Sequence, residues 1–351
     1  MVKLQTITKI LFTFSLCLVF CGCAILANIS YSYAFSRTED IPDKQFHTFI
    51  TWKDIDQEKY PRENIYFNSG GNLLQGFIYG AENNNGLVII SHGMGNTADY
   101  YLKMIMYFID NGWRVFSYNN TGVSGSQGKG VRGLTQSLFD LDAALFYISN
   151  SQELNHLPIM LAGHSWGGFA ACTVLNYDHK INAVVSFAGF NNGNEVINDL
   201  GVSTVGKFFN VFSKNIRNIE ERMFGETSKL TAVDGINKAG IPVLIIQSSD
   251  DDVIFAQTSS IYAHRESITN PLAQIIYFDG EEAAGHAFVF CSKEQREYVK
   301  WTHESWKQYR SKNRRASVQQ WALENNYDVF KANELNIELM DHINTFFNNA
   351  R

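Results

Sequence analysis

Short apolar runs alternate with helical stretches through the middle of the chain, and this alternation constrains the fold more than any other feature. Apolar runs of strand length are typical of strands that are buried on both faces. The expected strands are 87–91, 113–118, 159–162, 183–188, 243–247 and 274–278, and the expected helices are 100–111, 134–149, 169–176 and 258–265. Such alternation predicts a mainly parallel sheet with helices on both faces. Upstream, the turn Ser69-Gly70-Gly71-Asn72 lies between 65–68 and 73–79, which predicts an antiparallel hairpin at one edge of the sheet.

The pentapeptide Gly163-His164-Ser165-Trp166-Gly167 lies between one of these strands and the helix that follows it. A Gly-x-Ser-x-Gly turn from strand to helix is typical of a nucleophile elbow, which holds its serine in a strained conformation. Side chains at 163 and 167 would collide with the neighbouring strand and helix, so glycine is required there. The context predicts Ser165 as a catalytic nucleophile. The alternative is a tight turn without chemistry.

A serine hydroxyl needs a base, and the base needs an orienting acid. His286 follows the last expected strand and a polar loop, so it can reach back over the sheet edge. Three adjacent carboxylates, Asp250, Asp251 and Asp252, follow the strand 243–247, and one of them could hold the imidazole. Their spacing does not choose among them. A solvated acidic turn, or negative charge at a helix N-terminus, would also explain them.

The glycine-containing segment Ser91–Asn96 follows the first long apolar strand, where the backbone can approach a substrate. We expect the backbone N–H groups of Met94 and Trp166 to form the oxyanion hole. His92 in this segment is expected to be a structural hydrogen-bonding residue rather than a second base.

With these parts in this order, the chain resembles the α/β-hydrolase superfamily over about residues 64–300, and within it the group of monoacylglycerol lipases and serine aminopeptidases. The matching stretches are 91–95, 118–125, 163–168, 241–254 and 285–286. The resemblance implies the α/β-hydrolase fold. It also implies that Asp251, three residues before Ile254, is the triad acid, with Asp250 as the fallback. Phe255, where the family usually has proline, and Asn119-Asn120, where it often has an aspartate, depart from the pattern outside the triad.

The N-terminal residues 1–34 form a distinct segment. Lys3 and Lys9 precede a run without charged residues from Ile10 to Ile29, and Ser32-Tyr33-Ala34 offers a small-x-small cleavage site. This pattern predicts an uncleaved membrane anchor or a cleaved signal peptide, with a lipoprotein or a buried helix as further alternatives. The lysines favour a cytoplasmic N-terminus. The catalytic domain is therefore expected outside the cytoplasm, or secreted or periplasmic after cleavage.

The rest of the chain is divided into three parts. We expect a lead-in at 35–63, the α/β-hydrolase domain at 64–300 and a C-terminal helical extension at 301–351 that packs on the same domain. Within the domain, residues 190–236 are too long for a simple crossover and form a candidate lid. Their apolar stripe at helical spacing is Val205, Phe208, Phe209 and Phe212.

The predicted function is that of a serine hydrolase that cleaves carboxylic esters through an acyl-enzyme, on monoacylglycerol- or lysophospholipid-like substrates. The membrane is the other expected partner, through the N-terminal segment. The formal net charge of −6 gives no sign of a nucleic-acid partner, and the cysteine and histidine spacing suggests no zinc site. The expected acyl-enzyme mechanism needs no cofactor. The alternatives are a serine aminopeptidase-like peptidase, an acyltransferase, a cofactor-free peroxidase or a non-catalytic binding member of the same fold.

Overall fold

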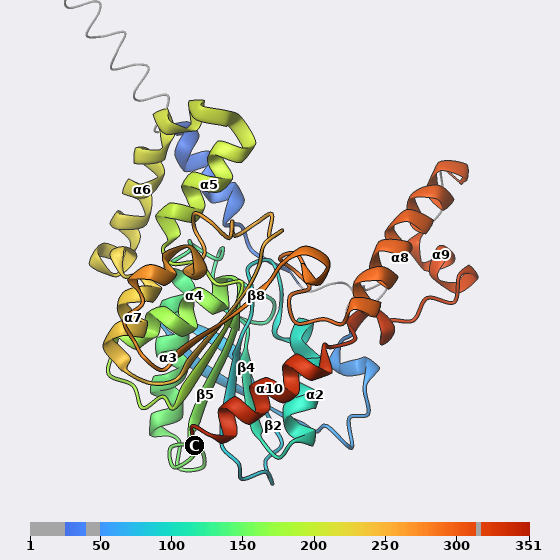
Figure 1. The fold of residues 1–351 in the computed structure, drawn as a ribbon, viewed down its shortest axis with the longest axis horizontal. Coiled ribbons are helices and arrows are strands. Elements are labelled where there is room, and N and C mark those ends of the chain that lie inside the picture. Colours follow the sequence, from blue (N-terminus) through green and yellow to red (C-terminus); the bar gives the residue numbers. More distant parts are fainter. Residues whose placement is uncertain (1–24, 40–49, 314–316) are drawn as a thin grey trace, which may run out of the picture.

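In a computed structural model, which describes residues 25–39, 50–313 and 317–351, one eight-stranded sheet forms the centre of the protein (Figure 1). The strand order is β1-β2-β4-β3-β5-β6-β7-β8; β1 and β2 are antiparallel and the strands from β4 to β8 are parallel. The strands are β1 (Arg62–Ser69), β2 (Asn72–Tyr79), β3 (Leu87–Ser91), β4 (Arg114–Tyr118), β5 (Ile159–His164), β6 (Ala183–Phe187), β7 (Val243–Ser248) and β8 (Ala273–Phe278). The predicted α/β-hydrolase architecture, with its N-terminal hairpin, is confirmed.

Helices cover both faces of the sheet, and alternate side chains of each central strand enter two separate cores. Ile89 of β3 packs in the core beneath α3 (Gln136–Asn150), α4 (Trp166–Thr173) and α7 (Ala232–Ala239). Val88 packs in the core beneath α2 (Leu102–Asp110) and α10 (Ile337–Asn348). Because both faces are buried, successive residues of these strands are apolar, which is why the strands were visible as continuous runs in the sequence.

The segment 190–236 differs from the single lid that the sequence predicted. It contains α5 (Gly193–Val205), the 3-10 turn η4 (Gly206–Phe209), α6 (Asn210–Phe224), the 3-10 turn η5 (Gly225–Lys229) and the start of α7. Gly206 has φ +69° and separates α5 from η4, so the stripe 205–212 is not one continuous helix. Since α7 packs in the core against α4, the part that stands away from the sheet is α5 to α6 (Figure 1).

The helix expected at 258–265 differs in both type and bounds, because this region forms the 3-10 helix η6 (Ile261–Ser267). The backbone N–H groups of Thr258, Ser259 and Ser260 all donate to the carbonyl of Phe255, which forms a turn in place of a first helical turn. The Ser260 side chain then caps η6 by accepting from the N–H of Ala263.

The C-terminal extension begins earlier than expected, because the boundary at 300 falls inside α8 (Lys293–Lys312). Helix α8 and helix α9 (Val318–Glu324) extend away from the sheet, whereas α10 returns to it (Figure 1). Buried side chains of α10 that join the core are Leu339, Met340, Ile343, Phe346 and Phe347.

Residues 1–24, most of the predicted anchor or signal segment, lie outside the described residues. Residues 25–34 are helical and lie beside α5 and α6 (Figure 1). Within the described part of the chain, no helix combines the length and the hydropathy needed to span a bilayer. The lead-in 35–63 is packed where it is described, because Ile50, Ile55 and Tyr60 form a buried cluster with Leu102 of α2.

Candidate active site

Ser165 sits at the turn from β5 to α4 with φ 55°, a conformation that is strained for a residue with a side chain. Its N–H donates to the carbonyl of Phe187 at 2.8 Å, which fixes the turn against β6. A Cβ atom at Gly163 would lie 2.2 Å from the carbonyl oxygen of Gly167, and one at Gly167 would lie 2.0 Å from the carbonyl oxygen of Ser91. The turn therefore requires glycine at both positions, as the sequence predicted.

The structure brings the side chains of Ser165, His286 and Asp251 together in one line of hydrogen bonds. The distance from Ser165 Oγ to His286 Nε2 is 2.9 Å, and the distance from His286 Nδ1 to Asp251 Oδ2 is also 2.9 Å. The Asp251 side chain is fully buried and that of His286 is 12% exposed. A carboxylate at this place accepts from Nδ1–H and leaves Nε2 free to accept the serine proton.

The three adjacent acids have three different environments. Asp251 Oδ1 accepts from the N–H groups of Val253 and Ile254 at 3.0 and 2.7 Å, and Oδ2 also accepts from Gln247 Nε2 at 2.9 Å. Asp250 Oδ1 accepts from Ser248 Oγ and from the N–H of Gly285, so it holds the loop before His286 rather than its ring. Asp252 is exposed.

The predicted oxyanion residues Met94 and Trp166 line the same cavity as Ser165 and His286. His92 supports this loop: Nδ1 bonds to the carbonyl of Gly93 at 2.8 Å, and Nε2 accepts from the N–H of Asn120 at 3.0 Å. Burial lowers the pKa of His92 to about 4, so the ring is neutral at pH 7 and can accept at Nε2. These contacts place His92 in the structural role expected for it.

Sequence reasoning missed a hydrogen-bonded link between the oxyanion loop and the His286 loop. The N–H of Gly93 donates to Tyr101 Oη at 2.9 Å, and Tyr101 Oη lies 2.8 Å from His164 Nδ1. His164 Nε2 lies 3.0 Å from the carbonyl oxygen of His286. Burial, and then the neighbouring His286, lower the pKa of His164 to about 3, so its neutral ring donates at one nitrogen and accepts at the other. Only the position of His164 inside the pentapeptide could have drawn attention to it in the sequence.

An apolar cavity of about 1000 Å³ opens onto Ser165 and His286. Its lining comes from the oxyanion loop, from the lid helices α5 and α6 with η4, and from the N-terminal helix. Lid residues in the lining are Val196, Ile197, Leu200, Gly201, Thr204, Phe208, Phe209 and Ile216; residues of the N-terminal segment are Leu26, Ala27, Ser30, Tyr31, Ala34 and Phe35. The sequence predicted a lid contribution but gave no sign of the N-terminal one.

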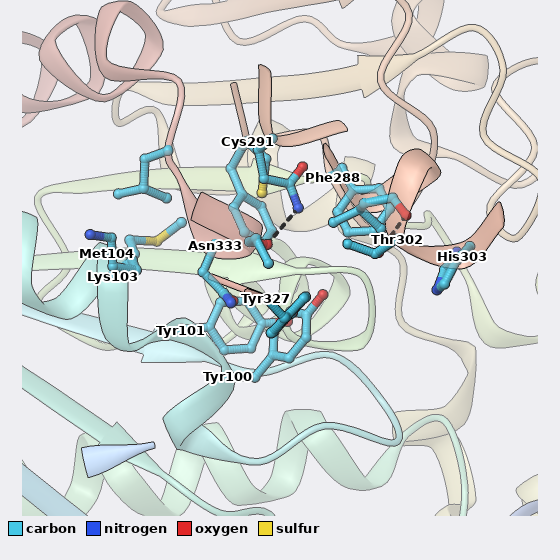
Figure 2. Close-up of a pocket in the computed structure, with 15 residues that line it drawn as sticks. Tyr100, Tyr101, Lys103, Met104, Phe288, Cys291, Thr302, His303, Tyr327 and Asn333 are labelled. Carbon is cyan, nitrogen blue, oxygen red and sulfur yellow. Dashed lines mark hydrogen bonds between the residues drawn. The ribbon is translucent and has the colours of Figure 1, made fainter. Parts of the chain in front are cut away.

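A second cavity, of about 170 Å³, lies where α8 and η8 (Lys331–Asn333) meet the start of α2 (Figure 2). Tyr100 and Tyr101 form one wall, and Cys291, Thr302 and His303 lie around the others (Figure 2). Burial raises the pKa of the Cys291 thiol to about 12, so this thiol is protonated and unreactive at neutral pH.

The other described cysteine, Cys172, is also buried, and its burial raises its pKa to about 12. Among the residues that the structure describes, no group of three or more histidine, cysteine, aspartate or glutamate side chains is arranged to hold a metal ion.

Comparisons with known proteins agree with this geometry. The model of the family described as serine aminopeptidase, S33, matches residues 82–230, which contain the oxyanion loop and Ser165 but neither Asp251 nor His286. No curated protein sequence matches the chain.

Among solved structures, an esterase from Pyrococcus furiosus superposes with a TM-score of 0.52 at 15% identity, covering 83% of this chain and 98% of the esterase. A second crystal form of that esterase gives a TM-score of 0.51 at 14% identity, covering 80% of this chain and 97% of the esterase. At this identity the likeness shows a shared fold. Together with the matched family model and the sheet order, it shows that the chain has the α/β-hydrolase fold.

Proposed function

We propose that this protein is a serine hydrolase that cleaves carboxylic esters with an apolar acyl chain. The observation that carries the proposal is the unbroken line of hydrogen bonds from Ser165 through His286 to Asp251, at a point where an apolar cavity opens. A serine that is bonded to a buried imidazole–carboxylate pair is activated for attack on a carbonyl carbon.

In the proposed mechanism, His286 Nε2 takes the proton of Ser165 Oγ as that oxygen attacks the ester carbonyl. Asp251 holds the ring and stabilises the imidazolium. The N–H groups of Met94 and Trp166 stabilise the negative oxygen of the tetrahedral intermediate. His286 then gives its proton to the leaving alcohol, and the acyl group remains on Ser165. Water, activated by His286, releases the acid and restores the serine. No step requires a cofactor.

The cavity lining supports an ester of the monoacylglycerol or lysophospholipid type as the substrate. Aliphatic and aromatic side chains from the lid and the N-terminal helix form most of its surface. Each buried methylene of an acyl chain contributes about 0.8 kcal/mol, so a longer chain binds more tightly until the cavity is filled.

A peptidase is the second candidate, because the matched family model is that of a serine aminopeptidase. The same triad would serve it, but its substrate presents an ammonium group, which needs a negative or strongly polar surface. The apolar lining near Ser165 suits a hydrocarbon chain better than a cation, so we favour the ester hydrolase.

Assays of the purified protein on p-nitrophenyl esters of increasing acyl length, beside aminoacyl p-nitroanilides, test the proposal. We expect ester hydrolysis with kcat/KM rising from acetate towards longer acyl chains, little anilide hydrolysis, and loss of ester hydrolysis in Ser165→Ala. Anilide hydrolysis that exceeds ester hydrolysis would establish the peptidase instead.

A further inference from the structure

We propose that the helix of residues 25–34 is a permanent wall of the acyl cavity, so that the functional enzyme keeps its N-terminal segment and takes its acyl chain at a lipid surface. This inference rests on the proposed ester hydrolase function and assigns a binding role to a segment that the sequence presented only as an anchor or a signal.

The first support is the pattern of contact. Leu26, Ala27, Ser30, Tyr31 and Ala34 all line the cavity, and their spacing places them on one face of the helix. Leu200 of α5 and Ile216 of α6 line the same cavity, and Ile216 packs against the cluster that Ala27 and Tyr31 form with Ile219. Without the N-terminal helix, the cavity would be open along this side, and an acyl chain within it would remain in contact with water.

The second support is a buried carboxylate that ties this helix to the lid and to the catalytic domain. Glu220 of α6 is 3% exposed and accepts from Tyr31 Oη, from the N–H of Leu134 at 2.9 Å and from Thr135 Oγ1 at 2.9 Å. A buried carboxylate is costly unless it is hydrogen-bonded, so loss of these donors would destabilise the contact between α6 and the N-terminal helix. The carbonyl of Leu134 in turn accepts from Trp166 Nε1 at 2.6 Å, so the helix is linked to the residue that follows Ser165.

The third support is the attachment of the residues directly after the helix. Ser36 pairs with Gly130, and Thr38 pairs with Val123, each through an isolated β-bridge. The Arg37 guanidinium donates to the carbonyl of Ser126 at 2.9 Å and to that of Gly128 at 3.0 Å. The N-terminal segment is thus held on the domain by Tyr31 within the cavity-lining helix and by backbone and side-chain bonds of the residues directly after that helix.

These contacts distinguish between the alternatives that the sequence left open. Cleavage after Ala34 would remove Tyr31 from Glu220 and would remove every N-terminal residue of the cavity lining except Phe35. An uncleaved anchor keeps the cavity intact. Leu26 and Phe208, which both line the cavity, are 57% and 65% exposed, so the cavity has an apolar rim at the helix that continues the charge-free run. Such a rim suits contact with a lipid surface.

A matched pair of substitutions on the N-terminal helix tests the wall directly. Both Ser30 and Ser32 are exposed, but only Ser30 lines the cavity, and Ser32 lies on the opposite face of the helix. In the full chain, Ser30→Trp should lower kcat/KM for a long-chain p-nitrophenyl ester by about tenfold, because the indole occupies space that acyl methylenes would fill. The loss on p-nitrophenyl acetate should be much smaller, so that the ratio of long-chain to acetate kcat/KM falls, because acetate offers few methylenes to the wall. Ser32→Trp should change neither rate.

Equal acyl-length profiles in the two variants would overturn the proposal. Hydrolysis of p-nitrophenyl acetate shows both that a variant is folded and that the protein is an ester hydrolase. If Ser30→Trp does not fold, Ala34→Leu on the same face of the helix replaces it. If the wild-type protein cleaves no ester, the proposed function fails. The role of the helix in the cavity is then tested by measuring the affinity of each variant for a fluorescent long-chain fatty acid. That affinity should fall in Ser30→Trp and not in Ser32→Trp. Mass spectrometry of the chain from membranes should find residues 25–34 retained, and a mature chain that starts at Phe35 would contradict the inference.

Discussion

Asp250, Asp251 and Asp252 have the same side chain, and only their surroundings give them different tasks. Asp251 contacts the His286 ring, Asp250 holds the backbone before it, and Asp252 is exposed. Asp251→Asn should therefore lower kcat for ester hydrolysis by roughly 10²- to 10⁴-fold, because an amide neither fixes the correct tautomer nor stabilises the imidazolium.

The other two acids are the controls for that prediction, with circular dichroism to verify folding. Asp250→Asn should lower kcat by about tenfold or less through a looser His286 loop, and Asp252→Asn should leave kcat unchanged. A loss in Asp250→Asn as large as that in Asp251→Asn would reassign the acid.

At the residue scale, the sequence was most informative where a motif fixes a backbone shape. The two glycines around Ser165 identified the elbow, because only glycine fits there. Asp251 could be distinguished from its neighbours only by resemblance, since adjacent acids in a loop follow no period that tells which one faces the site. The Tyr101–His164 link could not be predicted, because it joins residues whose contact depends on how three loops meet.

At the scale of single elements, α10 offers a direct test of packing, because it carries two isoleucines in opposite environments. Ile343 is fully buried against the sheet, and Ile337 is 53% exposed. Ile343→Ala should lower the free energy of unfolding by about 2–4 kcal/mol through lost burial and a residual cavity. Ile337→Ala should change it by no more than about 0.5 kcal/mol. Urea denaturation followed by fluorescence measures both values, and equal losses would show that α10 does not dock on the sheet.

Elements were predictable where burial gives a simple pattern. β3 and β7 are apolar at nearly every position, because both faces of the sheet are covered. The break between α5 and η4 was not predictable from the apolar stripe, since it depends on the left-handed conformation of Gly206 rather than on hydropathy. Likewise, the turn at Phe255–Ser260 depends on several N–H groups that share one carbonyl, and periodicity does not report this.

At the scale of the whole molecule, two buried neutral histidines couple stability to pH. The folded-state pKa of His92 is about 4 and that of His164 about 3, below the 6.5 of an unperturbed histidine, because burial disfavours the charged ring. The unfolded chain therefore binds more protons below about pH 6.5. The stability that these groups contribute is fully present above that pH and is lost as the pH falls towards their folded-state pKa values.

As the pH falls from roughly 6 to roughly 4, protonation of each histidine in the unfolded chain should lower the free energy of unfolding by about 1.4 kcal/mol per pH unit. Urea denaturation at several pH values should give a shallower pH dependence for His164→Gln than for wild type. His156→Gln, at an exposed position, should keep the wild-type slope. An unchanged slope in His164→Gln would mean that His164 is not held neutral by burial.

The overall architecture was predictable because a parallel sheet imposes its alternation on the whole chain. The docking of the N-terminal helix was not, because Tyr31 and Glu220 are separated by 189 positions in the sequence and nothing in their local patterns pairs them. A long-range contact through one buried carboxylate leaves no periodic trace. For the same reason, residues 25–34 could be recognised in the sequence only as the end of an apolar run, and their contact with the cavity could not be predicted.

Covalent labelling with a fluorophosphonate probe shows whether Ser165 is an activated nucleophile. We expect the wild-type protein to be labelled, peptide mapping to find the probe on Ser165, and Ser165→Ala to remain unlabelled. Labelling should also fall steeply in His286→Ala, which keeps the serine but removes its base. Failure of the folded wild-type protein to react, or equal labelling of Ser165→Ala, would show that Ser165 is not the activated nucleophile.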